Sequence, residues 1–134
     1  MSNNSGPGYA KHPEHRVGLE HANERVIVTF DGEVIADTTD AIRLREATYP
    51  PVYYVPRRDV KMDRLIRTEH HTYCPFKGEA SYFSLSSGRR AENAVWSYEK
   101  PYDEVIDIKD LLAFYPDRVD SIAAAPTPSS AGAR

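Results

Sequence analysis

The sequence predicts an all-β domain of mainly antiparallel strands, and three features of its 134 residues support this. Short runs rich in β-branched and aromatic residues recur along the chain. Each run is bounded by residues that favour turns, chiefly glycine, proline and aspartate. The length indicates one domain, large enough to bury a core without disulfide bonds. Seven or so short strands of this kind are typical of a sandwich or a barrel-like domain.

The first clear element is a β-hairpin. Residues 25–30 and 33–36 are rich in β-branched and apolar side chains, and Asp31-Gly32 lies between them. An Asp-Gly pair favours a two-residue type I′ turn, because that turn needs positive φ at both positions. In that register Val28 faces Ile35.

The later elements follow from the same kind of pattern. One short helix is predicted over residues 59–66, with Asp59 as its N-cap, because a short carboxylate accepts the free amide protons there. Residues 103–106 are ambiguous and allow a single helical turn. Proline, glycine and loop residues separate the other runs, which predict strands over residues 41–46, 52–55, 71–73, 79–85, 94–98 and 111–115.

Both ends of the sequence have the composition of tails. Residues 1–13 hold little apolar surface, and residues 122–134 are rich in alanine, serine and proline. Such segments cannot bury a core, so we expect both to be disordered. The folded domain is therefore predicted to span residues 14–121.

Composition argues against several classes of function. The formal charge of −3 is spread over interspersed acidic and basic residues, so nucleic acid is a poor partner. No apolar run approaches the length of a membrane span, and the N-terminus lacks the apolar core of a signal peptide. Cys74 is the only cysteine, which excludes an intramolecular disulfide and a cysteine-based zinc site. We therefore expect a cytoplasmic protein with no metal and no cofactor.

Four blocks of residues resemble a known family. They occur in order as Pro50-Pro-Val-Tyr-Tyr54-x-Pro-x-x-Asp59-Val60, Thr72-x-Cys-Pro-Phe-Lys77-Gly-x-Ala-x-Tyr82, Ala94-x-Trp-x-Tyr98-x-x-Pro101 and Ala113-Phe-Tyr-Pro-Asp-x-Val119. The chain resembles the domain of unknown function 427 family over residues 15–121. This resemblance implies a β-tent-like fold, in which two small antiparallel sheets lean together. Many β-tent proteins hold zinc with two Cys-x-x-Cys pairs, and this chain lacks those cysteines.

Aromatic residues within these blocks are the first candidate site. Tyrosine is an awkward core residue because its hydroxyl needs a partner, so a cluster of tyrosines indicates either a pocket wall or an aromatic core. Trp96 and Tyr98 must share a face of their strand. Lys77 is expected at the rim of such a pocket, with its stem over apolar surface. The predicted ligand-binding residues are Tyr54, Asp59, Lys77, Tyr82, Trp96 and Tyr98.

Cys74 and Lys77 are the second candidate site. A lysine three residues from a thiol can lower the thiol pKa and make it nucleophilic. The alternative is a small buried cysteine in a tight turn, followed by a solvated lysine. Glu46, which ends a predicted strand, is expected to pair with Arg43, Arg45 or Lys77.

Three functions remain open from the sequence. The first, which we favour, is a module that binds a small molecule or a peptide in an aromatic-lined cleft. The second is an enzyme that uses Cys74 with Lys77. The third is a structural or protein-interaction domain, such as a homodimer formed through an exposed strand edge.

Overall fold

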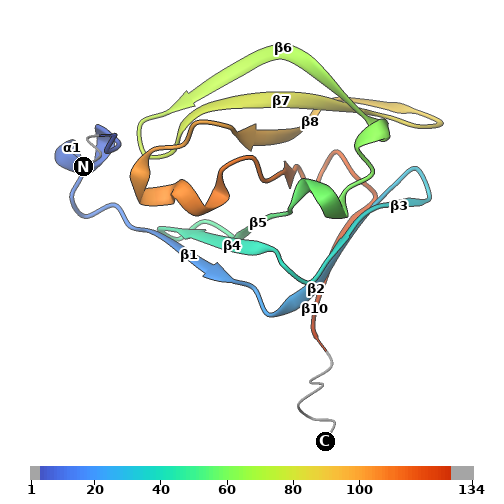
Figure 1. Cartoon of the computed structure of the whole chain (residues 1–134), viewed down its shortest axis with the longest axis horizontal. Coiled ribbons are helices and arrows are strands. Elements are labelled where there is room, and N and C mark those ends of the chain that lie inside the picture. Colours follow the sequence, from blue (N-terminus) through green and yellow to red (C-terminus); the bar gives the residue numbers. More distant parts are fainter. Residues whose placement is uncertain (1–3, 128–134) are drawn as a thin grey trace, which may run out of the picture.

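The computed structural model describes residues 4–127, whose strands form three antiparallel sheets (Figure 1). One sheet has the order β6-β7-β8-β9, and its strands span Leu65–Cys74, Gly78–Ser86, Arg90–Tyr98 and Ala113–Phe114. The second has the order β1-β4-β5, with strands Val17–His21, Ile42–Glu46 and Val52–Tyr54. The third has the order β10-β2-β3, with strands Ser121–Pro126, Glu24–Phe30 and Glu33–Thr38. The all-β prediction is confirmed, although the described residues form three sheets where two were expected.

Helical segments are short. A four-residue helix, α1, spans Gly8–Lys11, and three 3₁₀ segments, η1, η2 and η3, span Arg57–Asp59, Met62–Arg64 and Asp103–Ile108. The segment η3 extends the single turn expected over residues 103–106.

The helix predicted over residues 59–66 is confirmed only as one 3₁₀ turn, η2, over Met62–Arg64. Val60 pairs with Ala36 in an isolated bridge, and the Lys61 amide donates to the Ile35 carbonyl at 2.8 Å. These bonds to β3 hold the backbone extended between η1 and η2, so a continuous helix cannot form. Asp59 accepts a hydrogen bond from the Thr38 hydroxyl at 2.7 Å and makes no helix cap.

The β2–β3 hairpin has a bulge that shifts the expected register. Near the turn the pairs run as a two-residue loop requires, with Phe30 opposite Glu33. The register then shifts between Val28 and Thr29, so that Val28 faces Ala36 rather than Ile35. The bulge places both Ile35 and Ala36 in the buried core, which simple alternation would not do.

The structured part of the chain extends beyond residues 14–121 on both sides. The expected N-terminal tail contains α1, and the expected C-terminal tail contains all of β10 except Ser121, with β10 pairing with β2 from Ser121 to Pro126. Pairing with an existing strand orders this alanine-rich segment even though its own propensity for strand is low. Residues 1–3 and 128–134 of the predicted tails lie outside the described residues.

Two clusters of buried side chains stabilise the fold and position the site. The larger cluster joins the β2–β3 hairpin to the four-stranded sheet, through residues such as Val28, Phe30 and Leu85. The second cluster joins β4, β5 and η3 to the four-stranded sheet, through residues such as Leu44 and Ile108. Trp96 belongs to the second cluster but also reaches the surface.

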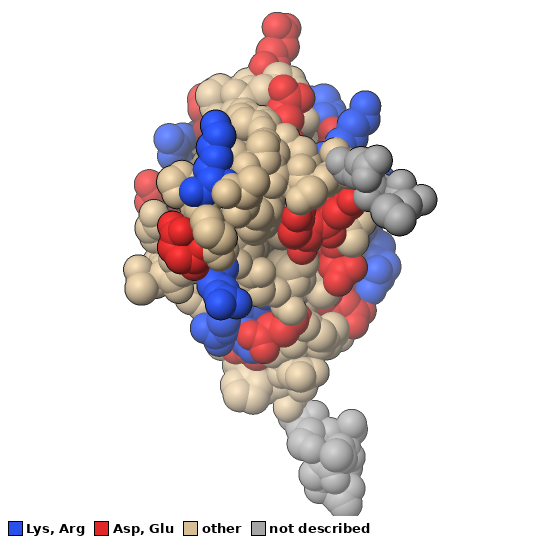
Figure 2. All heavy atoms as spheres, turned by 90° about the vertical axis from the view of Figure 1, so that its left-hand side faces the viewer, with Lys and Arg blue, Asp and Glu red and all other residues tan. Residues whose placement is uncertain are grey.

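The surface carries charges of both signs. Figure 2 shows lysine, arginine, aspartate and glutamate interspersed over the face that bears α1. Many of them form ion pairs, such as Arg25 with Asp37 at 2.7 Å. Among residues 4–127, no helix is long and apolar enough to cross a bilayer.

Candidate functional site

Four predicted aromatic residues converge on the second core cluster. Tyr82 on β7 lies opposite Trp96 on β8, and Tyr98 follows two residues later on the same face of that strand. Tyr54 on β5 approaches from the facing sheet, and its ring centroid lies 6.2 Å from that of Trp96 and 6.4 Å from that of Tyr98. Cys74, at the end of β6, packs against the same cluster.

The polar groups of these rings differ in the hydrogen bonds that they form. The Trp96 indole N–H donates to the Tyr54 hydroxyl at 3.2 Å. The Tyr82 hydroxyl lies 2.9 Å from the Thr72 hydroxyl and 3.3 Å from that of Tyr115. Burial raises the pKa of Tyr54, so this phenol is neutral at physiological pH.

An apolar cavity of about 240 Å³ lies beside Trp96. We call it the Trp96 pocket. It lies where the three sheets meet, because β5, β9 and β10 are each the terminal strand of a sheet and each contributes to its lining. It is lined by Val26, Val28, Pro51, Val52, Tyr53, Val55, Trp96, Phe114, Pro116 and Ile122.

The Trp96 pocket is layered from floor to rim. Val26 and Val28 form a fully buried floor, Trp96 and Ile122 are half-buried walls, and Pro51 at the rim is exposed. Such a lining offers shape and dispersion contacts to an apolar or planar group and few polar contacts.

One polar group stands at the edge of the Trp96 pocket. The Tyr53 hydroxyl donates to the Glu24 carboxylate at 2.9 Å, and Arg43 donates to the same carboxylate oxygen at 2.7 Å. The arrangement fixes the Tyr53 ring as a wall.

Lys77 does not lie at the rim of this pocket. It is 9 % exposed, and its ammonium donates to Glu46 at 2.5 Å. Glu46 also lies 2.8 Å from the His15 ring, and the Lys77 nitrogen is 3.8 Å from the Cys74 sulfur. We call His15, Glu46, Cys74 and Lys77 the Lys77 cluster. Of the three partners expected for Glu46, Lys77 is therefore the one to which it is hydrogen-bonded.

The charge of Glu46 is stabilised within the Lys77 cluster. Burial alone would raise the pKa of Glu46, but the hydrogen bonds and charges of Lys77 and His15 together hold it below its usual value. Glu46 therefore stays ionised and fixes the position of the lysine ammonium next to the thiol.

The N-terminal segment covers the turn that carries Cys74 and Lys77. The Gly8 amide donates to the Pro75 carbonyl at 3.0 Å, and the Tyr9 hydroxyl donates to the Phe76 carbonyl at 3.0 Å. The His15 ring stacks on Phe76 with centroids 3.9 Å apart.

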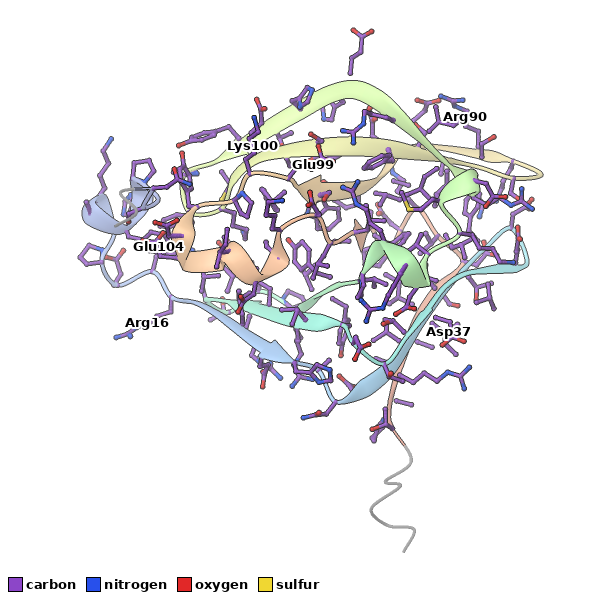
Figure 3. The ribbon with its side chains drawn as sticks, viewed as in Figure 1. Arg16, Asp37, Arg90, Glu99, Lys100 and Glu104 are labelled. Atoms are coloured by element: carbon purple, nitrogen blue, oxygen red, sulfur yellow. The ribbon has the colours of Figure 1, made fainter. Side chains whose placement is uncertain are left out.

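Glu104 anchors the same segment from η3 (Figure 3). It accepts hydrogen bonds from the Gly6 amide at 3.0 Å and from the Ser5 hydroxyl. Composition predicts a disordered tail for residues 1–13, so the sequence alone does not indicate that this segment covers the turn.

Asp59 lies apart from the other predicted ligand-binding residues. It borders a shallow depression lined by residues of β3 and of η1, including Ile35 and Lys61. Among residues 4–127, no three histidine, cysteine, aspartate or glutamate side chains are grouped so that they could hold a metal ion.

Several residues of the site were not predicted. The pocket walls Val52 and Ile122 carried no chemical signal, because apolar residues on short strands are typical of any core. His15 belongs to the Lys77 cluster but lies far from it in sequence, and no spacing rule connects the two. Tyr53 alternates with Tyr54, so its different face follows from strand geometry.

Comparison with known proteins places the chain in a family. No curated protein matches the sequence. The family model described as domain of unknown function (DUF427) matches residues 18–125, most of the chain. The matched range contains every residue of the Trp96 pocket and all of the Lys77 cluster except His15. The chain therefore belongs to the DUF427 family.

Proposed function

We propose that this domain is a binding module that accepts one small apolar or planar group in the Trp96 pocket. The observation that carries the proposal is the cavity of about 240 Å³ with its apolar and aromatic lining. Ligand sites for drug-sized molecules span about 300–1,000 Å³, so this cavity suits a single ring or a branched aliphatic group.

The expected affinity is modest. A one-ring ligand with about eight non-hydrogen atoms gains a fraction of a kcal/mol per atom, which corresponds to a dissociation constant of about 0.1–1 mM. Tighter binding needs a larger ligand that also reaches polar groups outside the pocket, such as the Tyr53 hydroxyl beside Glu24.

Trp96 offers a direct probe of occupancy. It is the only tryptophan in the chain, and it is a half-buried wall of the pocket. A ring placed against the indole displaces water from it and changes its emission. We therefore expect titration with benzyl alcohol to give a saturable change in Trp96 fluorescence.

Two matched variants make this experiment specific. Ile122→Phe enlarges a pocket wall and should weaken binding about tenfold or more. Ile27→Phe makes the same change on the neighbouring strand β2, but Ile27 alternates with the pocket residues Val26 and Val28 and so lies on the other face. Equal affinity of the two variants, or a non-saturable response of the unmodified chain, argues against the proposal.

The position of the pocket favours a peptide as the source of the apolar group. The outer edge of β10 has no neighbouring strand among residues 4–127, and Ile122 on this strand is a pocket wall. An extended peptide can add to such an edge through its backbone and place one side chain in a pocket. N-acetyl-phenylalanine amide should then bind more tightly than benzyl alcohol. If the natural ligand is instead a free small molecule, the added backbone amides should not increase the affinity.

A further inference from the structure

A thiol and an amine are held side by side in the Lys77 cluster. Cys74 and Lys77 occupy one tight turn, in which the Lys77 amide donates to the Cys74 carbonyl at 3.3 Å. Their side chains are also in contact, because the Cys74 sulfur and the Lys77 nitrogen are 3.8 Å apart. Glu46 restrains the lysine, because its carboxylate lies 2.5 Å from the same nitrogen.

Enclosure restricts what can reach this pair. Cys74 is half-buried and Lys77 is 9 % exposed, beneath the segment that contains Gly8 and Tyr9. A small oxidant can approach the sulfur more readily than a bulky thiol can. The chain has no second cysteine, so an oxidised Cys74 cannot form a disulfide within the chain.

The hydroxyl of Tyr98, a buried residue, lacks a hydrogen-bond acceptor among the described residues. Tyr98 is 7 % exposed and packs in the same cluster as Cys74, yet its hydroxyl has no hydrogen-bond partner among residues 4–127. Buried polar groups are almost always hydrogen-bonded, so an orphaned donor indicates a missing acceptor. An oxygen atom added to the Cys74 sulfur would introduce an acceptor into the same cluster.

We propose that Cys74 and Lys77 form a reversible covalent crosslink through a single oxygen atom, S–O–N, when the protein meets a peroxide. Two molecules of hydrogen peroxide are consumed and three of water are formed. The first peroxide oxidises the thiol to a sulfenic acid and is reduced to water. Lys77 releases its ammonium proton to solvent, and the second peroxide oxidises the neutral amine to a hydroxylamine and is itself reduced to water.

Condensation of these two oxidised groups closes the crosslink. The hydroxylamine oxygen attacks the sulfenic sulfur, and the sulfenic hydroxyl leaves as the third water. The S–H bond and one N–H bond of the neutral amine have been replaced by S–O and O–N bonds. Sulfur and nitrogen each lose two electrons, and these four electrons reduce the two peroxides. Two equivalents of a dithiol reductant reverse the change.

Mass spectrometry of the full chain tests this directly. After hydrogen peroxide, the crosslinked chain should gain one oxygen and lose two hydrogens, and Cys74 should resist alkylation by iodoacetamide. Because a modified lysine is not a trypsin site, residues 68–89 should remain one peptide instead of being cut after Lys77. Dithiothreitol should restore both alkylation and cleavage.

Variants separate the crosslink from ordinary thiol oxidation. Lys77→Arg keeps the positive charge beside Glu46 but removes the amine, so it should give only sulfinic and sulfonic acids on Cys74. Lys100→Arg, at an exposed lysine, should crosslink like the unmodified chain. The proposal is overturned if Lys77→Arg forms the same product, if Lys77 remains a trypsin site, or if the product lacks the added oxygen.

Discussion

Glu46 is the residue on which the Lys77 cluster depends, because its two carboxylate oxygens bind Lys77 and His15 separately. Glu46→Gln removes the charge but keeps the shape, which leaves the Lys77 ammonium buried without a counter-ion. We expect a loss of about 1–3 kcal/mol in the free energy of unfolding at pH 7, measured by urea denaturation. Glu20→Gln is the matched control at an exposed glutamate paired with Arg43 and Arg45, and its effect should be much smaller. Equal losses for both variants would show that the buried pair has no special role.

Glu99 makes a second carboxylate cluster with a defined pH dependence. Hydrogen bonds from Arg67 outweigh burial and, together with those from Arg57, lower the pKa of Glu99 from 4.5 to about 2. A carboxyl whose folded pKa is lowered stabilises the protein above its unfolded pKa, and that stabilisation disappears as the pH falls through the folded value. Glu99→Gln should therefore cost about 1–2 kcal/mol at pH 7 and progressively less between pH 4.5 and pH 2. A difference between the two proteins that stays constant down to pH 2 would contradict this assignment.

Among the elements, the β2–β3 hairpin depends on the backbone of its turn. Gly32 has a φ of +76°, which favours glycine, and a Cβ there would meet no neighbouring atom. Gly32→Ala should therefore lower stability through backbone strain alone, by about 1 kcal/mol in thermal or urea unfolding. Gly18→Ala on β1 is the control, because a Cβ there also meets open space but the backbone is extended. If both changes have the same effect, the strain is not the cause.

The N-terminal segment depends on one carboxylate of η3. Glu104→Gln weakens the bonds from the Gly6 amide and the Ser5 hydroxyl, so the segment should detach more often from the turn that carries Phe76. Hydrogen exchange of the Gly6 and Gly8 amides should speed up several-fold. Glu14→Gln changes a glutamate whose partner is His12 within the same segment, and it should leave these rates unaltered. Unaltered exchange in Glu104→Gln would mean that other contacts hold the segment.

How much the sequence predicts differs between elements. The β2–β3 turn, β4, β5 and the strands that carry Tyr82 and Trp96 were predictable, because β-branched and aromatic runs and turn residues act locally. The strand β10 was not, because its alanines form a strand only when β2 is already present to pair with them. The helix expected after Asp59 is reduced to the single turn η2 for the same reason, since pairing of Val60 and Lys61 with β3 competes with the local preference.

In the whole molecule, the candidate sites also combine features that local sequence predicts with features that depend on the packing of distant segments. Tyr54, Tyr82, Trp96 and Tyr98 lie in one cluster, as strand alternation and the family-like blocks predict, but of these four only Trp96 lines the Trp96 pocket. The Trp96 pocket was not predictable, because it forms where the terminal strands of three sheets meet, and sequence alone does not define sheet order. Lys77 was expected at a pocket rim, but Glu46 and the N-terminal segment enclose it. The likeness to β-tent proteins stays a prediction.

An isotope-filtered nuclear Overhauser experiment shows whether an apolar group binds in the Trp96 pocket. The protein is labelled with ¹³C at its valine and isoleucine methyl groups and is saturated with unlabelled benzyl alcohol. We predict contacts from the ligand ring to the methyl groups of Val52 and Ile122, which line the pocket. Contacts that appear only at methyl groups outside the pocket, such as those of Ile66 and Ile106, would show that the ligand binds elsewhere. The absence of any contact at a saturating concentration would show that the pocket does not bind it.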